Sequence, residues 1–383
     1  MKTGVSEGDT SAVDDQGRGH YWSGTFFVLQ CYSSIYRCFS LQSNYYFRDL
    51  MAAAGAVKTL VRHWGTLLLI LGLSACGPGI NSTPPLIPVT LQLSFFHQAE
   101  FAGFYAAEQL GYYKEEGLQV SFIEGGPEVD FIAPVASGAA QFGVAQPADV
   151  ILARSAGKSV RSIAVIYRRS PIVFFSLSDS GITRPEDFIG KKIRSTTTID
   201  QTLRAMMSRL KIQPDQYEVV YLPSDIAQFA SGDVPVWGGF MNIFALEVQR
   251  AGYSINIIYP DDYGIHFYGN VLITTDDLIE QNPDLVQRFT RATLAGWTYV
   301  VENPESAGAF VQHYNPRANP ELEIEKMTAS IPLVNTGEDF IGWMKPEVWS
   351  HMEQTLREQG VLAGPLDLES TYTLRFLREI YDR

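Results

Sequence analysis

Strand-like and helix-like segments alternate along most of this 383-residue chain, and this order limits the folds that it can adopt. Residues 89–96 alternate apolar and polar side chains, as a half-buried strand does, and residues 101–110 follow as an expected short helix. Further strands are expected at residues 119–124, 141–145, 160–167 and 172–177. Because a β-α-β-α order favours a mostly parallel sheet with helices on both faces, we expect an α/β fold.

A second β-α series begins after Asp179-Ser180-Gly181, a turn-forming tripeptide. Its expected strands are residues 191–194, 218–222, 234–237 and 254–259, and its expected helices are residues 200–210, 226–231 and 242–251. One more strand at 271–274 precedes a helical C-terminal part. Two such series indicate two lobes around a cleft, and open parallel sheets bind ligands beyond the carboxyl ends of their strands.

Residues 51–75 have the order of parts found in a bacterial lipoprotein signal peptide. Lys58 and Arg62 precede a run of about 12 mostly apolar residues, too short to span a bilayer, and the run ends in Leu73-Ser74-Ala75-Cys76, which looks like a lipobox. The thiol of Cys76 would receive the lipid, and residues 76–88 would form a flexible tether. We therefore expect a lipid anchor on the extracytoplasmic face of the cell membrane. The alternative is a short core helix that ends in a buried cysteine.

Residues 1–50 do not fit a signal that must begin near the start of a chain. Met51 stands where such a signal should begin, so residues 1–50 are expected to be a mis-assigned extension. A genuine disordered or membrane-proximal extension is the alternative.

Composition excludes several classes of protein. The formal net charge of −13 argues against a nucleic-acid binder, which normally carries a basic patch. The three cysteines, Cys31, Cys38 and Cys76, are too few for a disulfide framework and lack zinc-ligand spacing. No apolar run approaches 20 residues, so an integral membrane protein is not expected.

An ordered set of short motifs resembles the substrate-binding proteins of the NMT1/THI5-like family. The motifs are His97-Gln98-Ala99-Glu100-Phe101-Ala102-Gly103-Phe104-Tyr105, Gly111-Tyr112-Tyr113-Lys114-Glu115-Glu116-Gly117-Leu118, Ser137-Gly138, Phe142-Gly143-Val144, Gly190-Lys191-Lys192-Ile193, residues 263–270 and Asn282-Pro283-Asp284-Leu285-Val286. The resemblance implies a periplasmic-binding-protein fold of the second type. One lobe would hold residues 88–178 and 271–383, and the other would hold residues 179–270.

The same family contains two different functions. Most bacterial members look like receptors of ABC importers for planar heterocycles, whereas the fungal members are suicide enzymes that make the thiamine pyrimidine. The enzyme branch needs a lysine just after the glycine of the strand matching Phe142-Gly143-Val144, but here Ala145-Gln146-Pro147 follow. The consumed histidine is replaced by Asp149, and the cysteine cluster expected near residues 265–270 is missing. We therefore expect no enzyme activity and no cofactor. No metal site is expected either, because the histidines lack paired spacing.

A receptor for a flat heterocycle needs aromatic faces for stacking and a few fixed polar groups for the ring edge. Among the candidates, His97 would donate to a ring carbonyl, Trp237 would be a stacking platform, and Asp149 would either face the ligand or serve as a helix N-cap. The hydroxyl run Ser195-Thr196-Thr197-Thr198 would grip acceptor oxygens or form an ordinary capped loop. The candidate ligand-binding residues are Phe96, His97, Phe101, Gln146, Asp149, Tyr167, Thr196, Thr197, Trp237, Asn242, Tyr263, Tyr268 and Asn270.

These features predict a receptor that captures a heteroaromatic ligand, closes its lobes and delivers the ligand to an ABC permease driven by a cytoplasmic ATPase. Abundant aromatic candidates and uncharged partners such as Gln146 and Asn270 favour riboflavin over a thiamine pyrimidine precursor. A sulfonate or nitrate-type receptor is the third possibility, but it would need basic residues that these loops hardly supply.

Overall fold

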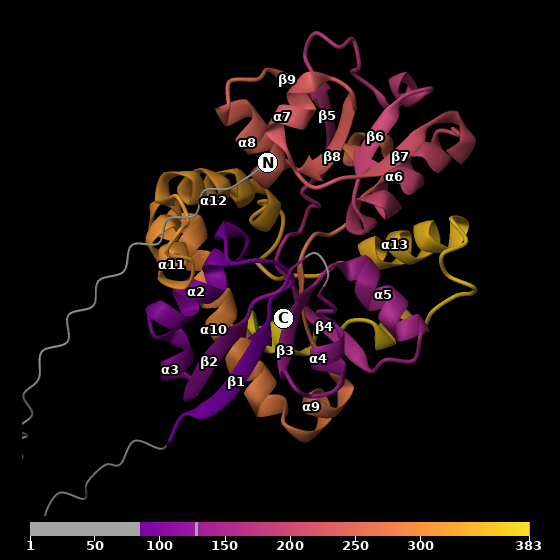
Figure 1. Cartoon of the computed structure of the whole chain (residues 1–383). Helices are drawn as coiled ribbons and strands as arrows, with labels where there is room; N and C mark the ends of the chain where they lie inside the picture. The colour runs from indigo at the N-terminus through magenta and orange to yellow at the C-terminus, as the bar shows by residue number, and fades with distance from the viewer. Residues whose placement is uncertain (1–84, 127–128, 383) are drawn as a thin grey trace, which may run out of the picture. The chain divides into compact units, whose positions relative to one another are not determined.

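The computed structural model describes residues 85–126 and 129–382, which build on two five-stranded sheets (Figure 1). The strands of the first sheet are, in sheet order, β2 (Leu118–Ile123), β1 (Ile87–Gln92), β3 (Phe142–Ala145), β10 (Val271–Thr275) and β4 (Val160–Val165). Strand β1 pairs in parallel with β2 and β3, whereas β10 runs antiparallel between β3 and β4. Residues 1–84, and with them the expected extension, signal peptide, Cys76 and most of the tether, lie outside the described residues.

The second sheet repeats this arrangement with a contiguous stretch of chain. Its strands are, in sheet order, β7 (Glu218–Tyr221), β6 (Lys192–Ser195), β8 (Val236–Phe240), β5 (Ile172–Leu177) and β9 (Ile255–Ile258). Strand β6 pairs in parallel with β7 and β8, and β5 runs antiparallel between β8 and β9. The expected mixed α/β fold, with mostly parallel sheets, is therefore confirmed.

One boundary expected from the sequence is wrong. We expected residues 172–177 to continue the first sheet and the first lobe to extend to residue 178, but β5 belongs to the second sheet. The chain therefore crosses from one sheet to the other at residues 166–171. Strand β5 is apolar and almost wholly buried, so its sequence carries no mark of which sheet it joins.

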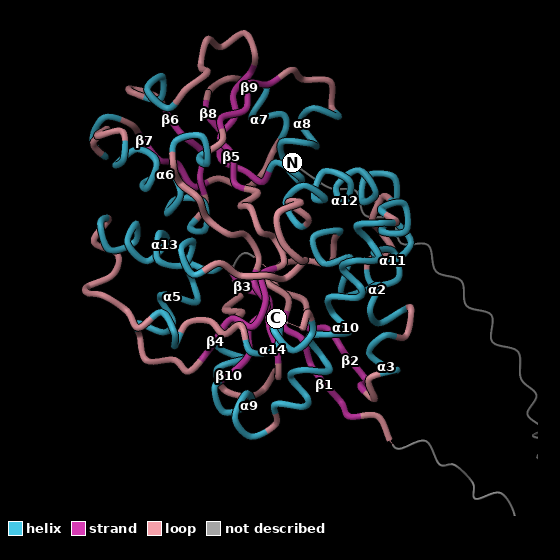
Figure 2. Tube along the Cα trace, turned by 180° about the vertical axis from the view of Figure 1, so that it is seen from behind, coloured by secondary structure: helices cyan, strands magenta, loops and turns pink. Residues whose placement is uncertain are grey.

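Helices flank the first sheet on two sides, as the opposite views of Figures 1 and 2 both show. On one side lie α2 (Ala102–Gln109), α3 (Tyr112–Glu115), α11 (Ala307–Tyr314) and α12 (Pro320–Val334). On the other side lie α5 (Pro147–Ser155) and α13 (Pro346–Glu358). The remaining helices of this part are α4 (Ala133–Ala136), α9 (Asp276–Gln281), α10 (Pro283–Glu302) and α14 (Arg375–Ile380). No helix among the described residues has the length and apolar character needed to cross a bilayer.

A close helix contact explains two glycines of this part. Helix α10 packs on α2, and a Cβ atom added to Gly103 would lie 2.2 Å from the Trp297 ring. A Cβ atom on Gly296 would lie equally close, at 2.2 Å, to the carbonyl oxygen of Gly103. Only glycine at both positions lets the two helices approach this closely.

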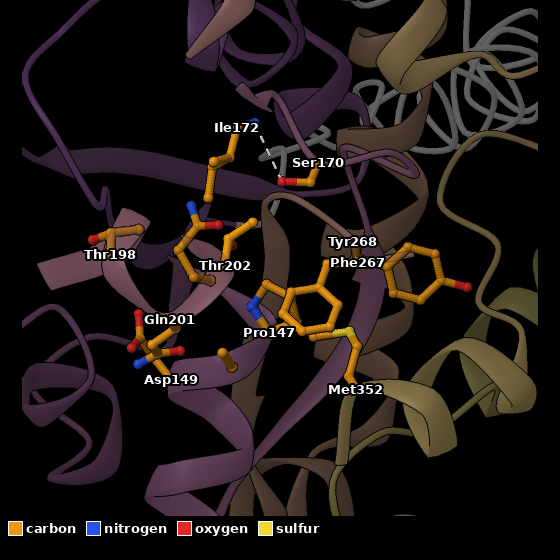
Figure 3. Close-up of a pocket in the computed structure, with 12 residues that line it drawn as sticks. Pro147, Asp149, Ser170, Ile172, Thr198, Gln201, Thr202, Phe267, Tyr268 and Met352 are labelled. Atoms are coloured by element: carbon orange, nitrogen blue, oxygen red, sulfur yellow. Dashed lines mark hydrogen bonds between the residues drawn. The ribbon is translucent and has the colours of Figure 1, made fainter. Parts of the chain in front are cut away.

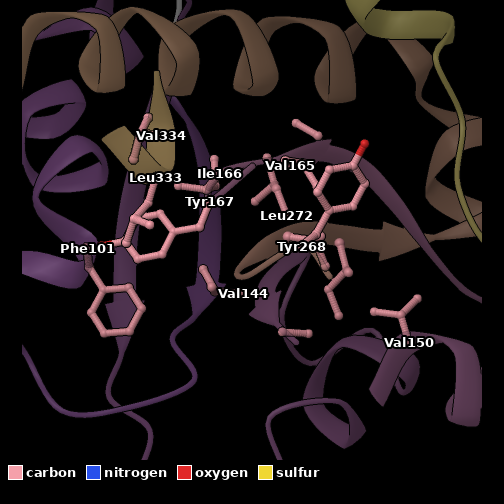
Figure 4. Close-up of a cluster of buried hydrophobic side chains, with 14 of the residues drawn as sticks. Phe101, Val144, Val150, Val165, Ile166, Tyr167, Tyr268, Leu272, Leu333 and Val334 are labelled. Carbon is pink, nitrogen blue, oxygen red and sulfur yellow. The ribbon is translucent and has the colours of Figure 1, made fainter. Parts of the chain in front are cut away.

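The second sheet carries α6 (Thr197–Arg209), α7 (Ile226–Ser231), a π-helical turn η5 (Met241–Ala245) and α8 (Leu246–Arg250). The expected helix 242–251 is thus two pieces, because the chain leaves β8 through the wider π turn before it becomes α-helical. Part of the main core lies where the chain crosses between sheets: Tyr167 lies beside Leu333 and Val334 of α12 (Figure 4). A separate cluster of buried hydrophobic side chains, which includes Phe175, Trp237 and Phe244, packs against the second sheet.

Candidate functional site

A narrow pocket lies between the N-terminal ends of α5 and α6, so residues of both sheets form its walls (Figure 3). The α5 end contributes Gln146 and Asp149, and α6 contributes Thr198 and Gln201. Its free volume is only about 20 Å³, enough for a water-sized group, so a ring system could enter only if the two sheets moved apart. The complete lining is Gln146, Pro147, Ala148, Asp149, Ser170, Ile172, Thr198, Gln201, Thr202, Phe267, Tyr268 and Met352.

Asp149 is the only carboxylate in this lining, which holds no lysine, arginine or histidine. Burial, with a smaller contribution from Asp130, raises the pKa of its carboxyl to about 6. Within the described residues, its carboxylate takes part in no hydrogen bond or ion pair. Asp149 is not the N-cap either, because the N-cap of α5 is Gln146 and makes no side-chain capping bond. The pocket therefore holds a half-buried carboxylate whose hydrogen-bonding capacity is unused.

The N-terminal ends of two helices meet at this pocket. Helices leave their first backbone N–H groups without intrahelical partners, and these groups attract acceptor oxygens. Thr196 is the N-cap of α6, and its hydroxyl accepts a 3.4 Å bond from the backbone N–H of Ile199. The hydroxyl of Thr198 and the amide of Gln201, one helical turn further on, reach the pocket from the same helix (Figure 3).

A buried chain of hydrogen bonds holds the first-sheet wall. The Gln146 amide donates to Asn270 Oδ1 at 2.6 Å, and the Asn270 amide donates to Glu100 Oε1 at 2.7 Å. Gln98 donates to the other oxygen of Glu100, also at 2.7 Å. Burial raises the pKa of Glu100 despite these bonds. Asn270 therefore positions Gln146 from behind the pocket and does not line it.

A second polar cluster joins the two sheets away from the pocket. Asn242, in η5, donates to the hydroxyl of Ser330 in α12 at 2.7 Å. Tyr167, two residues after the end of β4, donates to the same hydroxyl at 3.2 Å. Both Asn242 and Tyr167 are almost wholly buried, so this structure places them in a contact between sheets and not on a ligand surface.

Three of the predicted ligand residues line the pocket: Gln146, Asp149 and Tyr268. Several others lie elsewhere. The expected role of Trp237 as a stacking platform conflicts with its place in the core of the second sheet, where its indole N–H donates to the Val234 carbonyl at 2.8 Å. Phe101 is likewise fully buried in the main core. Strand alternation explains the error, because a residue near a strand end faces either the cleft or the core.

His97 does not line the pocket and contacts its own lobe. Its Nδ1 lies 2.7 Å from the Tyr105 hydroxyl, and its ring stacks on that of Tyr314 at a centroid distance of 5.4 Å. Burial lowers the pKa of His97, and Glu124 partly opposes this effect. The remaining candidates, Phe96, Thr196, Thr197 and Tyr263, do not line the pocket.

Sequence reasoning did not name as candidates eight other residues of the lining: Pro147, Ala148, Ser170, Ile172, Gln201, Thr202, Phe267 and Met352. Gln201 and Thr202 follow Thr198 at helical spacing, a signal that could have found them. Met352 comes from α13, far along the chain, and no local pattern points to it.

A larger cavity of about 240 Å³ adjoins the pocket and shares Ser170, Ile172, Thr202 and Phe267 with it. Its other walls include Met241, Tyr259, Asp261, Asp262 and Leu333. Neither cavity has the ligands of a metal site: within the described residues, His, Cys, Asp and Glu side chains form no group of three that could hold a metal ion.

Comparison with known proteins bears on these features. The chain is 27% identical over 339 residues to the riboflavin-binding protein RibY of Chloroflexus aurantiacus, covering 81% of this chain and 96% of RibY. It is 28% identical over 321 residues to the formylaminopyrimidine-binding protein of Halalkalibacterium halodurans, covering 80% of this chain and 96% of that protein. It is 24% identical over 299 residues to the 4-amino-5-hydroxymethyl-2-methylpyrimidine phosphate synthase of Legionella pneumophila, covering 76% of this chain and 92% of the synthase.

Among solved structures, the periplasmic aliphatic sulphonate-binding protein SsuA of Escherichia coli matches with a TM-score of 0.60 and 15% identity, over 75% of this chain and 92% of SsuA. This likeness identifies the fold as the two-lobed one of periplasmic binding proteins. The family described as NMT1/THI5 like matches residues 98–307, which is more than half of the sequence. The chain is therefore a member of the NMT1/THI5-like family.

Proposed function

We propose that this protein is a solute-binding protein that holds a planar heteroaromatic ligand between α5 and α6 and closes its two lobes around it. One observation carries the proposal: Asp149 presents a half-buried carboxylate without a protein partner, opposite Thr198 and Gln201 of the other lobe (Figure 3). A half-buried carboxylate that no protein group contacts and whose pKa is raised is a candidate for ligand contact in a pocket.

The chemistry of the lining suits the edge of a nitrogen heterocycle. The Asp149 carboxylate accepts from a ring N–H or an exocyclic amine, and the Gln201 amide and Thr198 hydroxyl can each donate or accept. Phe267 and Tyr268 supply aromatic faces beside them. The Tyr268 hydroxyl is already fixed, because it accepts a 2.8 Å bond from the backbone N–H of Lys345.

Binding, and not catalysis, is what this lining supports. It contains neither a lysine for a Schiff base nor a histidine, although some relatives are named as pyrimidine phosphate synthases. The resemblance expects the lysine where Ala145-Gln146-Pro147 stand and the histidine where Asp149 stands. Of these residues, Gln146, Pro147 and Asp149 line the pocket.

Riboflavin is the ligand that we favour, and a formylaminopyrimidine or another thiamine pyrimidine precursor is the alternative. The riboflavin-binding and the formylaminopyrimidine-binding relative each match most of the chain at similar sequence identity. Sequence identity alone therefore does not choose between the two ligands. As part of the same proposal, the protein is exported, carries lipid on Cys76 and delivers its ligand to an ABC permease and ATPase.

Fluorescence titration of the purified protein tests the proposal. We expect riboflavin emission to be quenched with a sub-micromolar midpoint, and Asp149→Asn to weaken binding about tenfold by removing a charged acceptor. Asp130→Asn, near Asp149 but outside the lining, is the matched control and should bind as the wild type does. A response to formylaminopyrimidine alone would select the alternative ligand, and no response to either would refute the heterocycle proposal.

A further inference from the structure

Arg194 is a buried cation held by neutral groups at the end of the second sheet. It lies in β6 and is only 4% exposed. Its Nε donates to the Leu222 carbonyl at 2.8 Å, Nη1 donates to the Gly238 carbonyl at 2.8 Å, and Nη2 donates to the Ser224 hydroxyl at 3.3 Å. These three bonds use three of the five N–H groups of the guanidinium.

Arg194 has no negatively charged partner among the described residues. Arg168, the other buried arginine of the described chain, pairs with Asp339 at 3.1 Å. Arg194 forms no ion pair with any described residue, and its only charge-related neighbour is the ring of Trp237, whose centroid lies 5.5 Å from Cζ. Burying an unpaired charge is costly, and a cation–π contact offsets only a part of that cost. Burial accordingly lowers the pKa of Arg194 to about 10.

One end of this guanidinium bonds to a residue of a surface loop. Nη2 bonds to Ser224, an exposed residue of the loop that follows β7, and the Ser224 hydroxyl keeps its own proton to donate. The neighbouring Asp225 is occupied, because its Oδ1 accepts from the backbone N–H groups of Ala227 and Gln228 at the start of α7. This loop follows the carboxyl end of a parallel strand, where open α/β sheets bind their ligands.

Arg194 is also close in sequence to the pocket. Thr198, which lines the pocket, follows it by four residues, so their Cα atoms lie no more than about 15 Å apart. A ligand with a ring in the pocket and an acidic substituent can therefore extend toward Arg194.

We propose that Arg194 and Ser224 form an anion subsite that receives a phosphate or carboxylate group of the ligand. This inference rests on the proposed function and extends it: a heterocycle that carries an acidic group should bind more tightly than the same heterocycle without that group. The anion accepts hydrogen bonds from the free guanidinium N–H groups and from the Ser224 hydroxyl. Its negative charge balances the positive charge that no described residue of the protein pairs.

Riboflavin and flavin mononucleotide test the subsite because they differ by one phosphate. We expect the purified protein to bind flavin mononucleotide about tenfold more tightly than riboflavin, and Arg194→Met to reduce this preference to about one. Added salt and inorganic phosphate should weaken binding of the mononucleotide and leave riboflavin binding unchanged. Arg194→Lys should keep part of the preference, because it keeps the charge but loses the planar fork of donors.

Arg204→Met is the matched control, since it removes a cation from the same lobe that is already paired with Asp200 at 2.7 Å. It should leave the preference unchanged. Ser224→Ala, at an exposed position, should reduce the preference without affecting folding, and so keeps the test valid if Arg194→Met does not fold. Equal binding of the two flavins by the wild type, or an unchanged preference in Arg194→Met, would overturn the inference.

The subsite can also be measured without a flavin. Inorganic phosphate should raise the melting temperature of the wild type and of Arg204→Met more than that of Arg194→Met. If neither flavin binds but this difference is found, the proposed ligand is wrong and the anion subsite stands. If a flavin binds and neither the preference nor this difference is found, the receptor stands and the subsite is wrong.

Discussion

The two lobes touch on two sides of the chain crossings, and the two contacts differ in how completely their polar groups are paired. On the α12 side, Lys326 lies 2.9 Å from Glu247 of α8 and 3.3 Å from Glu323, and Asn242 bonds to Ser330. On the α5–α6 side, the carboxylate of Asp149 faces Thr198 and Gln201 without a protein partner. On the α12 side the charged groups are paired, although the buried Asn242 Oδ1 accepts no hydrogen bond, whereas on the α5–α6 side a carboxylate has capacity for a ligand. The contrast separates residues that hold the lobes together from residues available for recognition.

The largest effect should come from breaking the paired side. Burial alone would lower the pKa of Lys326, but Glu323 and Glu247 outweigh burial and hold it above its usual value. Lys326→Met leaves Glu323 buried without its cation, and Glu323 also accepts a 2.6 Å bond from the backbone N–H of Ala99. We expect a loss of about 3 kcal/mol in the free energy of unfolding, measured with urea.

The control for this variant is Arg250→Met, which removes an exposed pair with Glu325 across the same contact. Its expected cost is below about 1 kcal/mol, because water screens exposed pairs. Equal losses in the two variants would show that the buried charges do not hold the lobes together.

A smaller effect should appear on the unpaired side, as a dependence on pH. The pKa of Asp149 is raised in the folded protein to about 6 from an ordinary value near 4, so the folded state holds the proton more tightly than the unfolded state. The stabilisation is complete below about pH 4 and is lost as the pH rises through about 6. Asp149→Asn should therefore gain stability relative to the wild type, on the order of 1–2 kcal/mol, between pH 4 and 7.

Chemical denaturation of both proteins at a series of pH values measures this difference. A difference that does not vary with pH would mean that the Asp149 carboxylate is solvated or paired in solution. Bound ligand should abolish the difference, because the ligand then supplies the partner that the protein lacks.

The smallest effect should come from the hydrogen bond between the lobes. Asn242→Ala removes the 2.7 Å bond to Ser330 and should cost about 1 kcal/mol of stability. Because this bond holds the lobes in an arrangement whose pocket has room only for a water-sized group, its loss should ease separation of the lobes and leave ligand affinity unchanged or raised, although Asn242 lies outside the pocket. Calorimetric titration with the ligand checks this, and a lower affinity would show that the bond also supports the ligand-bound arrangement.

The alternation of strands and helices was enough to predict the fold, because period and order are local properties of a sequence. The sheet that receives β5 was not predictable in the same way, since an apolar strand fits either sheet. Among the residues that line the pocket, Gln146 and Asp149 were expected there because they follow a buried strand at a helix start. Trp237 was misplaced because the side-chain direction at a strand end depends on register, which the partner strand sets.

Other parts of the site depend on long-range contacts that no local signal reports. Met352 reaches the pocket from α13, and the chain Gln98–Glu100–Asn270–Gln146 joins segments more than a hundred residues apart. Asn270 was expected to bind the ligand, whereas here it accepts a hydrogen bond from Gln146 and does not line the pocket.

The place of β10 between β3 and β4 has a consequence for the order of folding. All five strands of the second sheet lie within residues 172–258, so that sheet can form as soon as this stretch has been synthesised. The first sheet stays divided between β3 and β4 until residues 271–275 emerge. During N-to-C synthesis, the lobe that begins the chain is therefore expected to be the last to finish folding.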